Sequence, residues 1–237
     1  MILITSGCSF SKSIPPHHHT WPSHVQKYLD CEHRDCAMGS QGNGIIMRRL
    51  LYECNLALKE NKSDELLIGV MWSGPDRFDF YSERHGKLVN KDNWMVNPVS
   101  FMPEDPGGWV ILNYGWKMED SKAWYGRFHN PIYAQWLTLE YILQVQNYLK
   151  LHDIRYFMMT YTDKVLPESV CCDDRLRWMY EQIDFNKFVG DQGCYEWCRD
   201  HSGLEFPVPG DNHPSTEQHE AYAQKVIIPY LVENNLI

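Results

Sequence analysis

The chain opens with Met1-Ile2-Leu3-Ile4-Thr5-Ser6-Gly7-Cys8-Ser9, and this stretch decides how the rest is interpreted. Its first five residues are mostly apolar, and Ser6-Gly7 ends the run, which predicts a short buried strand. Such a strand delivers Ser9 to its carboxyl end. Ligands bind at that edge in open α/β sheets, so we expect Ser9 to lie at a functional site.

Strands and helices are expected to alternate along the rest of the chain. Apolar runs predict further strands near Cys36–Met38, at Leu66–Trp72 and at Ile154–Tyr161. Apolar residues at helical spacing predict helices over residues 20–29, 46–57, 132–151 and 216–230, and mainly helical structure over 173–198. The alternation implies right-handed crossovers between parallel strands. The expected fold class is α/β, a three-layer α/β/α sandwich with a mainly parallel, flavodoxin-like sheet.

Length and composition fit a single domain over residues 1–237. The 237 residues are 43% hydrophobic and 14% aromatic, which is enough for a full core. Residues 78–130 break the alternation with many Trp, Tyr, Gly, Pro and Asn residues, so we interpret them as an insertion. Its tryptophans either anchor the insertion by packing or line a binding groove; they are Trp94, Trp109, Trp116 and Trp124.

Charge and hydropathy exclude several classes of partner. The formal net charge is −9 and there is no Lys/Arg-rich run, so we expect no nucleic-acid binding, which draws on clustered positive charge. Neither a leader pattern nor a run of about 18 apolar residues is visible, so we expect no membrane partner and a cytoplasmic protein. The eight cysteines are then expected to be reduced thiols. The oligomeric state stays open.

A second informative segment, Asp211-Asn212-His213-Pro214, lies just before the last expected helix. A serine hydroxyl becomes an effective nucleophile when an imidazole takes its proton and a carboxylate fixes the tautomer of that imidazole. His213 and Asp211 supply both groups if the backbone bends between them, and the flanking glycine and proline favour such a bend. Ser9, His213 and Asp211 are therefore the candidate catalytic residues.

These segments resemble the sequence blocks of the SGNH (GDSL-like) hydrolase family. The Gly-Asp-Ser block of the family matches Gly7-Cys8-Ser9, and its Asp-x-x-His-Pro block approximately matches residues 211–214. Ala37–Asn43 looks like the block whose glycine offers an oxyanion-hole N–H. The resemblance implies the same fold, and an oxyanion held by the N–H groups of Ser9 and Gly42. It also implies a serine esterase acting on small acyl esters, including acetyl groups on carbohydrates.

The sequence departs from the family pattern at three points. Cys8 stands where the family has Asp, the carboxylate precedes the histidine by two residues instead of three, and no Gly-x-Asn-Asp block follows the strand that ends at Trp72. Ser73 or Asn43 would replace the missing oxyanion donor, and one such donor is worth on the order of 10²–10³ in rate. Arg77 and Trp72 are the candidate substrate-binding residues, Arg77 because a guanidinium can bind a carboxylate or sulfate. It equally fits an ion pair with a neighbouring aspartate.

Other reactive side chains suggest rival sites. Cys8 is a rival nucleophile, but adjacent residues of an extended segment point to opposite sides, so we expect Cys8 to pack inside. The run His17-His18-His19 suggests a metal site, yet only two of its imidazoles would share a side, and catalytic zinc has three protein ligands. Cys194 and Cys198 lack a second pair at matching spacing. We therefore expect no metal and no cofactor.

Alternatives to the esterase stay open at this point. One is an acyltransferase that uses the same triad. The other is a non-catalytic glycan-binding or structural protein on a degenerate SGNH scaffold, which the missing asparagine supports. The expected partner of the enzyme is a small-molecule or glycan ester. The Trp72–Pro75 segment and the Trp-rich insertion also resemble uncharacterised SGNH-like proteins encoded by phages and environmental microbes.

Overall fold

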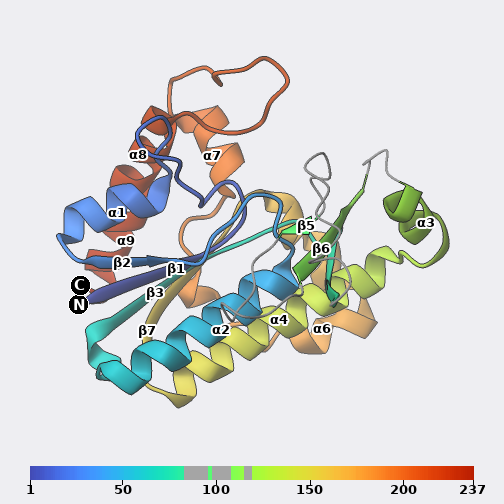
Figure 1. The fold of residues 1–237 in the computed structure, drawn as a ribbon, viewed down its shortest axis with the longest axis horizontal. Coiled ribbons are helices and arrows are strands. Elements are labelled where there is room, and N and C mark those ends of the chain that lie inside the picture. Colours follow the sequence, from blue (N-terminus) through green and yellow to red (C-terminus); the bar gives the residue numbers. More distant parts are fainter. Residues whose placement is uncertain (83–95, 98–107, 115–118) are drawn as a thin grey trace.

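The computed structural model of the protein describes residues 1–82, 96–97, 108–114 and 119–237. Its central sheet has four parallel strands in the order β2-β1-β3-β7 (Figure 1). They are β1 (Ile2–Ser6), β2 (Glu32–Asp35), β3 (Leu66–Trp72) and β7 (Arg155–Thr160). The parallel sheet and its helical crossovers confirm the predicted α/β class.

Helices cover both faces of this sheet (Figure 1). One face carries α1 (Trp21–Leu29), α7 (Cys194–His201), α8 (Thr216–Tyr222) and α9 (Ile228–Glu233), with a π-helical turn at Ala223–Ile227 between the last two. The other face carries α2 (Asn43–Glu60), α4 (Pro131–Leu151), α5 (Glu168–Cys172) and α6 (Asp174–Tyr180). Short 3₁₀ turns lie at Ser63–Glu65, Asp163–Val165 and Phe185–Lys187. The arrangement is the predicted three-layer sandwich.

Each central strand contributes side chains to two cores, because successive residues of a strand point to opposite faces. In β3, Leu66, Ile68 and Val70 pack in the core under α2 and α4, whereas Leu67 and Met71 pack in the core under α1 and α8. All seven residues of β3 are buried. A strand buried on both faces is a continuous apolar run, which is why the sequence predicts β3 so closely.

The second strand lies earlier in the chain than predicted. The expected strand near Cys36–Met38 is wrong, since β2 occupies Glu32–Asp35 and pairs with β1 alone. An edge strand faces solvent, and charged residues there are common because they discourage pairing with another chain. Because β2 is polar, the hydropathy pattern does not identify it as a strand. The apolar residues after it belong to the loop that leads to α2.

The stretch predicted as an insertion contains regular structure of its own. An antiparallel sheet in the order β4-β6-β5 is formed by β4 (Arg77–Ser82), β5 (Val96–Asn97) and β6 (Gly108–Asn113), and α3 (Glu119–Arg127) follows. Trp109 is buried beside Ile45, and the ring of Trp124 stacks on Phe78 with centroids 3.9 Å apart. Both tryptophans therefore pack against protein. Trp94 and Trp116 lie outside the described residues.

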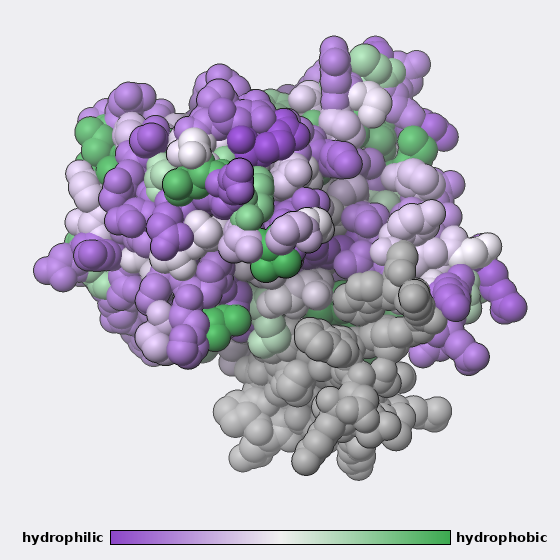
Figure 2. Space-filling view, turned by 90° about the horizontal axis from the view of Figure 1, so that it is seen from above, coloured by the Kyte–Doolittle hydropathy of each residue, from purple (hydrophilic) through white to green (hydrophobic). Residues whose placement is uncertain are grey.

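The surface seen from above is mostly hydrophilic, with small separate hydrophobic areas (Figure 2). This agrees with the formal net charge of −9. Within the described part of the chain, none of the helices has the length and apolar character needed to cross a membrane.

Candidate active site

Ser9 lies in a tight turn at the carboxyl end of β1. The N–H of Ser11 donates to the carbonyl of Cys8 at 2.9 Å and closes the turn. Gly7 permits it, because a Cβ at this position would lie 2.2 Å from Ser11 Oγ and 3.1 Å from the carbonyl oxygen of Met71. Cys8 is buried, as predicted, while Ser9 is partly exposed. The turn thus presents the hydroxyl and hides the thiol.

The loop before α8 brings an imidazole and a carboxylate to this hydroxyl. Ser9 Oγ and His213 Nε2 are 2.7 Å apart, and His213 Nδ1 and Asp211 Oδ1 are 2.5 Å apart. The backbone N–H of His213 also donates to Asp211 Oδ1 at 3.1 Å. This second bond makes the bend by which a carboxylate only two residues away reaches the ring.

Hydrogen bonding from His213 lowers the pKa of Asp211, so the carboxylate stays ionised. An ionised carboxylate accepts the Nδ1 proton and leaves Nε2 as the acceptor facing Ser9. The arrangement can therefore take the hydroxyl proton of Ser9. The structure brings together the three residues that the sequence predicts as catalytic.

A capping box fixes the position of this loop relative to α8. Ser215 Oγ accepts from the N–H of Gln218 at 3.2 Å, and Gln218 Oε1 accepts from the N–H of Ser215 at 2.9 Å. Helix α8 in turn packs against α1, which follows the Ser9 turn in the chain. The segments that carry Ser9 and His213 thus lead into neighbouring helices, although the two residues are distant in sequence.

The imidazole is supported on one side and open on the other. The ring of Phe10, which is buried, lies 5.0 Å from the ring of His213 at an interplanar angle of 38°, and Tyr161 contacts Phe10 edge-on. The side chains of His213 and Asp211 are 47% and 46% exposed. Water therefore reaches the pair, which weakens their electrostatic interaction relative to a buried triad.

A cavity of about 320 Å³ opens beside Ser9 and His213. Gly39 lines it, and a Cβ at Gly39 would meet only open space. The cavity is lined by residues of three loops: Ser9, Lys12, Ile14, His18, Gly39, Pro207, His213 and Pro214. Gly39 and Ile14 are not among the residues predicted for the site, whereas His18 belongs to the His17–His19 run that the sequence suggests as a metal site. The signal for Gly39 is its membership of the same glycine-containing block as Gly42.

Gly42, predicted to hold the oxyanion, is placed against β4 instead. It is the N-cap residue of α2, and a Cβ there would lie 2.3 Å from Asp79 Oδ2 and 2.9 Å from the carbonyl oxygen of Arg77. Gly42 is not among the residues that line the Ser9 cavity. Its lack of a side chain is thus accounted for by the close approach of α2 to β4.

Asn43 and Ser73, the two predicted replacements for the missing oxyanion donor, are bonded to each other. Asn43 Oδ1 accepts from the N–H of Ser73 at 2.7 Å, and Asn43 Nδ2 donates to the carbonyl of Ser73 at 2.9 Å. Both residues are buried. The Asn43 side chain thus joins the start of α2 to the backbone at the end of β3, and neither residue lines the Ser9 cavity.

The predicted substrate-binding residues lie away from Ser9. Trp72 is completely buried and its Nε1 donates to the sulfur of Met158 at 3.4 Å, so the prediction that it binds substrate is wrong. Arg77 donates to the carbonyl of Gln41 at 3.3 Å, and its guanidinium lies 5.5 Å from the centre of the Tyr161 ring. Arg77 lines a separate cavity of about 30 Å³, room for roughly one water.

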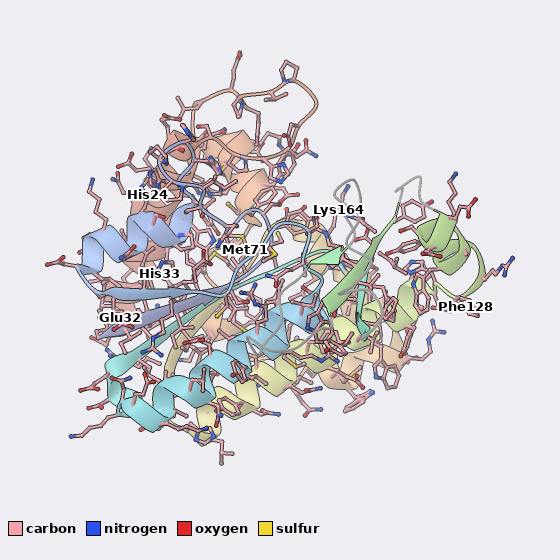
Figure 3. All side chains as sticks on the ribbon, in the orientation of Figure 1. His24, Glu32, His33, Met71, Phe128 and Lys164 are labelled. Atoms are coloured by element: carbon pink, nitrogen blue, oxygen red, sulfur yellow. The ribbon has the colours of Figure 1, made fainter. Side chains whose placement is uncertain are left out.

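The histidines near the site are spread over several elements. His24 lies on α1 and His33 on β2 (Figure 3), and His33 Nε2 is 2.8 Å from Thr5 Oγ1. The His18 ring lies 5.6 Å from that of His219, which is fully enclosed, so burial lowers the pKa of His219 well below its usual value. Among the described residues, no three His, Cys, Asp or Glu side chains come together as a metal site.

Comparisons with known proteins add little to this geometry. No family model matches the sequence, and no curated protein matches it. A solved structure described as "Crystal Structure of TesA" is similar to this chain with a TM-score of 0.48 and 12% sequence identity, over 98% of this chain and 98% of that chain. The functional conclusion therefore depends on the geometry of the site.

Proposed function

We propose that this chain is a serine hydrolase of the SGNH type that cleaves a carboxylic ester. The observation that carries the proposal is the continuous chain of hydrogen bonds from Ser9 through His213 to Asp211. Ser9 Oγ attacks the ester carbonyl while His213 Nε2 accepts its proton and then passes it to the leaving alcohol. Water, activated by the same imidazole, releases the acid from the acyl-enzyme. Asp211 orients the ring and stabilises its charged form.

The backbone N–H groups of Ser9 and Gly39 are assigned to the oxyanion. Gly39 lines the cavity that contains Ser9, whereas Gly42 packs against Asp79. Without a contribution from the Asn43 amide, which is bonded to Ser73, this hole has two backbone donors. Because one donor is worth on the order of 10²–10³ in rate, we expect a working but modest enzyme.

The site favours hydrolysis over the two alternatives. Acyl transfer requires that water be kept from the acyl-enzyme, and the side chain of His213 is 47% exposed. A non-catalytic protein does not need a serine, an imidazole and a carboxylate joined by hydrogen bonds, so their arrangement supports an enzyme. Acetyl groups on carbohydrates stay a prediction, because the two described tryptophans of the insertion, Trp109 and Trp124, pack against protein and do not line the Ser9 cavity.

Intact mass measured after incubation with a fluorophosphonate, which reacts with activated serines, tests the proposal. The wild type is expected to gain a single adduct and Ser9→Ala none. Ser13→Ala is the matched control, because Ser13 lies in the same loop but bonds to Thr20 and Ser23 outside the cavity, and it should still gain the adduct. Turnover of p-nitrophenyl esters should fall on the order of 10⁴-fold in Ser9→Ala. Absence of both the adduct and turnover in the wild type would refute the assignment.

A further inference from the structure

We propose that the cavity beside Ser9 accepts an uncharged, apolar acyl chain of several carbons in preference to an acetyl group. This inference rests on the proposed function and specifies the substrate class of the same site. It starts from the larger apolar residues in the walls of the cavity, which come from two loops: Ile14 from the segment between β1 and α1, and Pro207 and Pro214 from the segment around His213.

Ile14 presents an apolar surface that no other part of the described protein covers. The residue is 62% exposed, although it lines a cavity that contains Ser9. An exposed apolar group in the wall of such a cavity favours a ligand that removes it from water. The apolar part of a substrate is the natural occupant.

The turn that carries Ile14 is held in place before any ligand arrives. The N–H of Ile14 donates to the carbonyl of His18 at 2.8 Å, and the N–H groups of His17 and His18 donate to the carbonyl of Ile14 at 3.0 Å each. The N–H of His19 then donates to Thr216 Oγ1 at 3.1 Å, which ties the turn to α8. A surface held in this way binds without the cost of ordering a loop.

Three titratable side chains line the cavity: Lys12 and His213 are each paired with an aspartate, and His18 is uncharged at neutral pH. The ammonium of Lys12 lies 2.9 Å from a carboxylate oxygen of Asp35, and the imidazole of His213 is bonded to Asp211. Burial, with a contribution from His213, lowers the pKa of His18, which keeps this ring uncharged at neutral pH. An anionic acyl group such as succinyl would therefore have to compete with Asp35 for Lys12, and moving its charge out of water would be unfavourable.

The size of the cavity sets the length of the chain. Its volume of about 320 Å³ is roughly ten times the share of one water molecule in the liquid, about 30 Å³, and a methylene group occupies a similar volume. Part of this space must hold the reacting ester. The remainder suits an acyl chain on the order of four to eight carbons, and an acetyl group would leave most of the apolar wall in contact with water.

Hydrolysis of p-nitrophenyl acetate, butyrate, hexanoate and succinate tests the inference. Each buried methylene is worth about fourfold in kcat/KM, so hexanoate should exceed acetate by roughly ten- to two-hundred-fold, the upper value applying to full burial. Succinate should be cleaved more slowly than butyrate, which has the same number of carbons. Ile14→Ala should lower kcat/KM for hexanoate by about fivefold, and the loss on acetate should be clearly smaller.

Val232→Ala is the matched control, because Val232 is an exposed aliphatic residue on α9 outside the cavity lining and should not alter the series. A preference for acetate in a protein whose Ser9 is labelled by fluorophosphonate overturns the inference and leaves the proposed function standing. Equal losses on acetate and hexanoate in Ile14→Ala also overturn it, since they mean that Ile14 shapes the catalytic turn. No labelling and no turnover of any ester overturn the proposed function, and the inference with it.

Discussion

Replacing Asp211 with Asn tests the carboxylate of the proposed machinery. The substitution keeps the size of the side chain but removes the charge beside His213, and the new amide can present N–H to Nδ1 and favour the wrong tautomer. In a buried triad the same change costs about 10⁴ in kcat. Here the carboxylate and the imidazole are 46% and 47% exposed, so we expect a smaller loss.

The size of that loss follows from the dielectric around the pair. Two unit charges about 4 Å apart interact by about 1 kcal/mol in water and about 4 kcal/mol near a protein surface. A pair that is half exposed lies between these limits, and about 2 to 3 kcal/mol of lost imidazolium stabilisation corresponds to a rate decrease on the order of 10². Asp211→Asn should therefore retain more activity than Ser9→Ala.

The assay is kcat and KM for p-nitrophenyl butyrate at several pH values, with Asp200→Asn as the control. Asp200 is a surface aspartate on α7 paired with Arg199, and its replacement should change neither constant. Because hydrogen bonding from His213 lowers the pKa of Asp211, this carboxylate stays charged as the pH falls past the ordinary value for an aspartate, so neutralisation of Asp211 at that value should not contribute to loss of activity in acid. A loss in Asp211→Asn below threefold, or one as large as 10⁴, would refute this reasoning.

Two further predictions concern the packing of α2 against β4. Burial raises the pKa of Asp79 to about 6 from 3.8, so the stability that its protonation contributes is present in acid and is lost as the pH rises through 6. In urea unfolding, the stability of Asp79→Asn relative to the wild type should therefore increase by about 2 to 3 kcal/mol between pH 4 and pH 7. A difference in stability that stays constant with pH would contradict this. Gly42→Ala should lower the melting temperature, because the added Cβ overpacks the contact between α2 and β4 at a cost of about 1 to 3 kcal/mol. Gly39→Ala should not lower it, because a Cβ at that position meets open space. Equal melting temperatures for the two variants would contradict the observed packing.

The sequence predicts most reliably the strands that are buried on both faces. β1 and β3 lie in the middle of the sheet, so their apolar runs coincide with the strands. β2, at the edge, has four polar residues whose strand conformation depends on pairing with β1, a contact with residues far away in the sequence. Local patterns carry no information about such a partner, so the sequence predicts this strand a few residues after its actual position.

The sequence does not predict the antiparallel sheet β4-β6-β5, and the reason is related. In β4, Phe78 and Phe80 alternate with Asp79, a pattern typical of a strand with its aromatic side chains inside. The structure buries Asp79 instead, with 3% of its side chain exposed, and leaves 37% of Phe80 exposed. In β6, Trp109 and Ile111 face one small core while Val110 and Leu112 face another. Both strands thus depend on neighbours that local periodicity cannot identify.

For the site, the sequence identifies the chemistry better than the geometry. The sequence identifies Ser9, His213 and Asp211 as a group because short segments with recognisable residues carry them, and the structure brings the three side chains within hydrogen-bonding distance. Choosing between Gly39 and Gly42 needs the direction of the chain after β2. α2 starts at Asn43, so Gly42 belongs to the helix start that packs on β4, and Gly39, three residues earlier, still lies in the loop that passes Ser9. Local sequence does not show where the loop ends and the helix start begins, so it cannot choose between the two glycines.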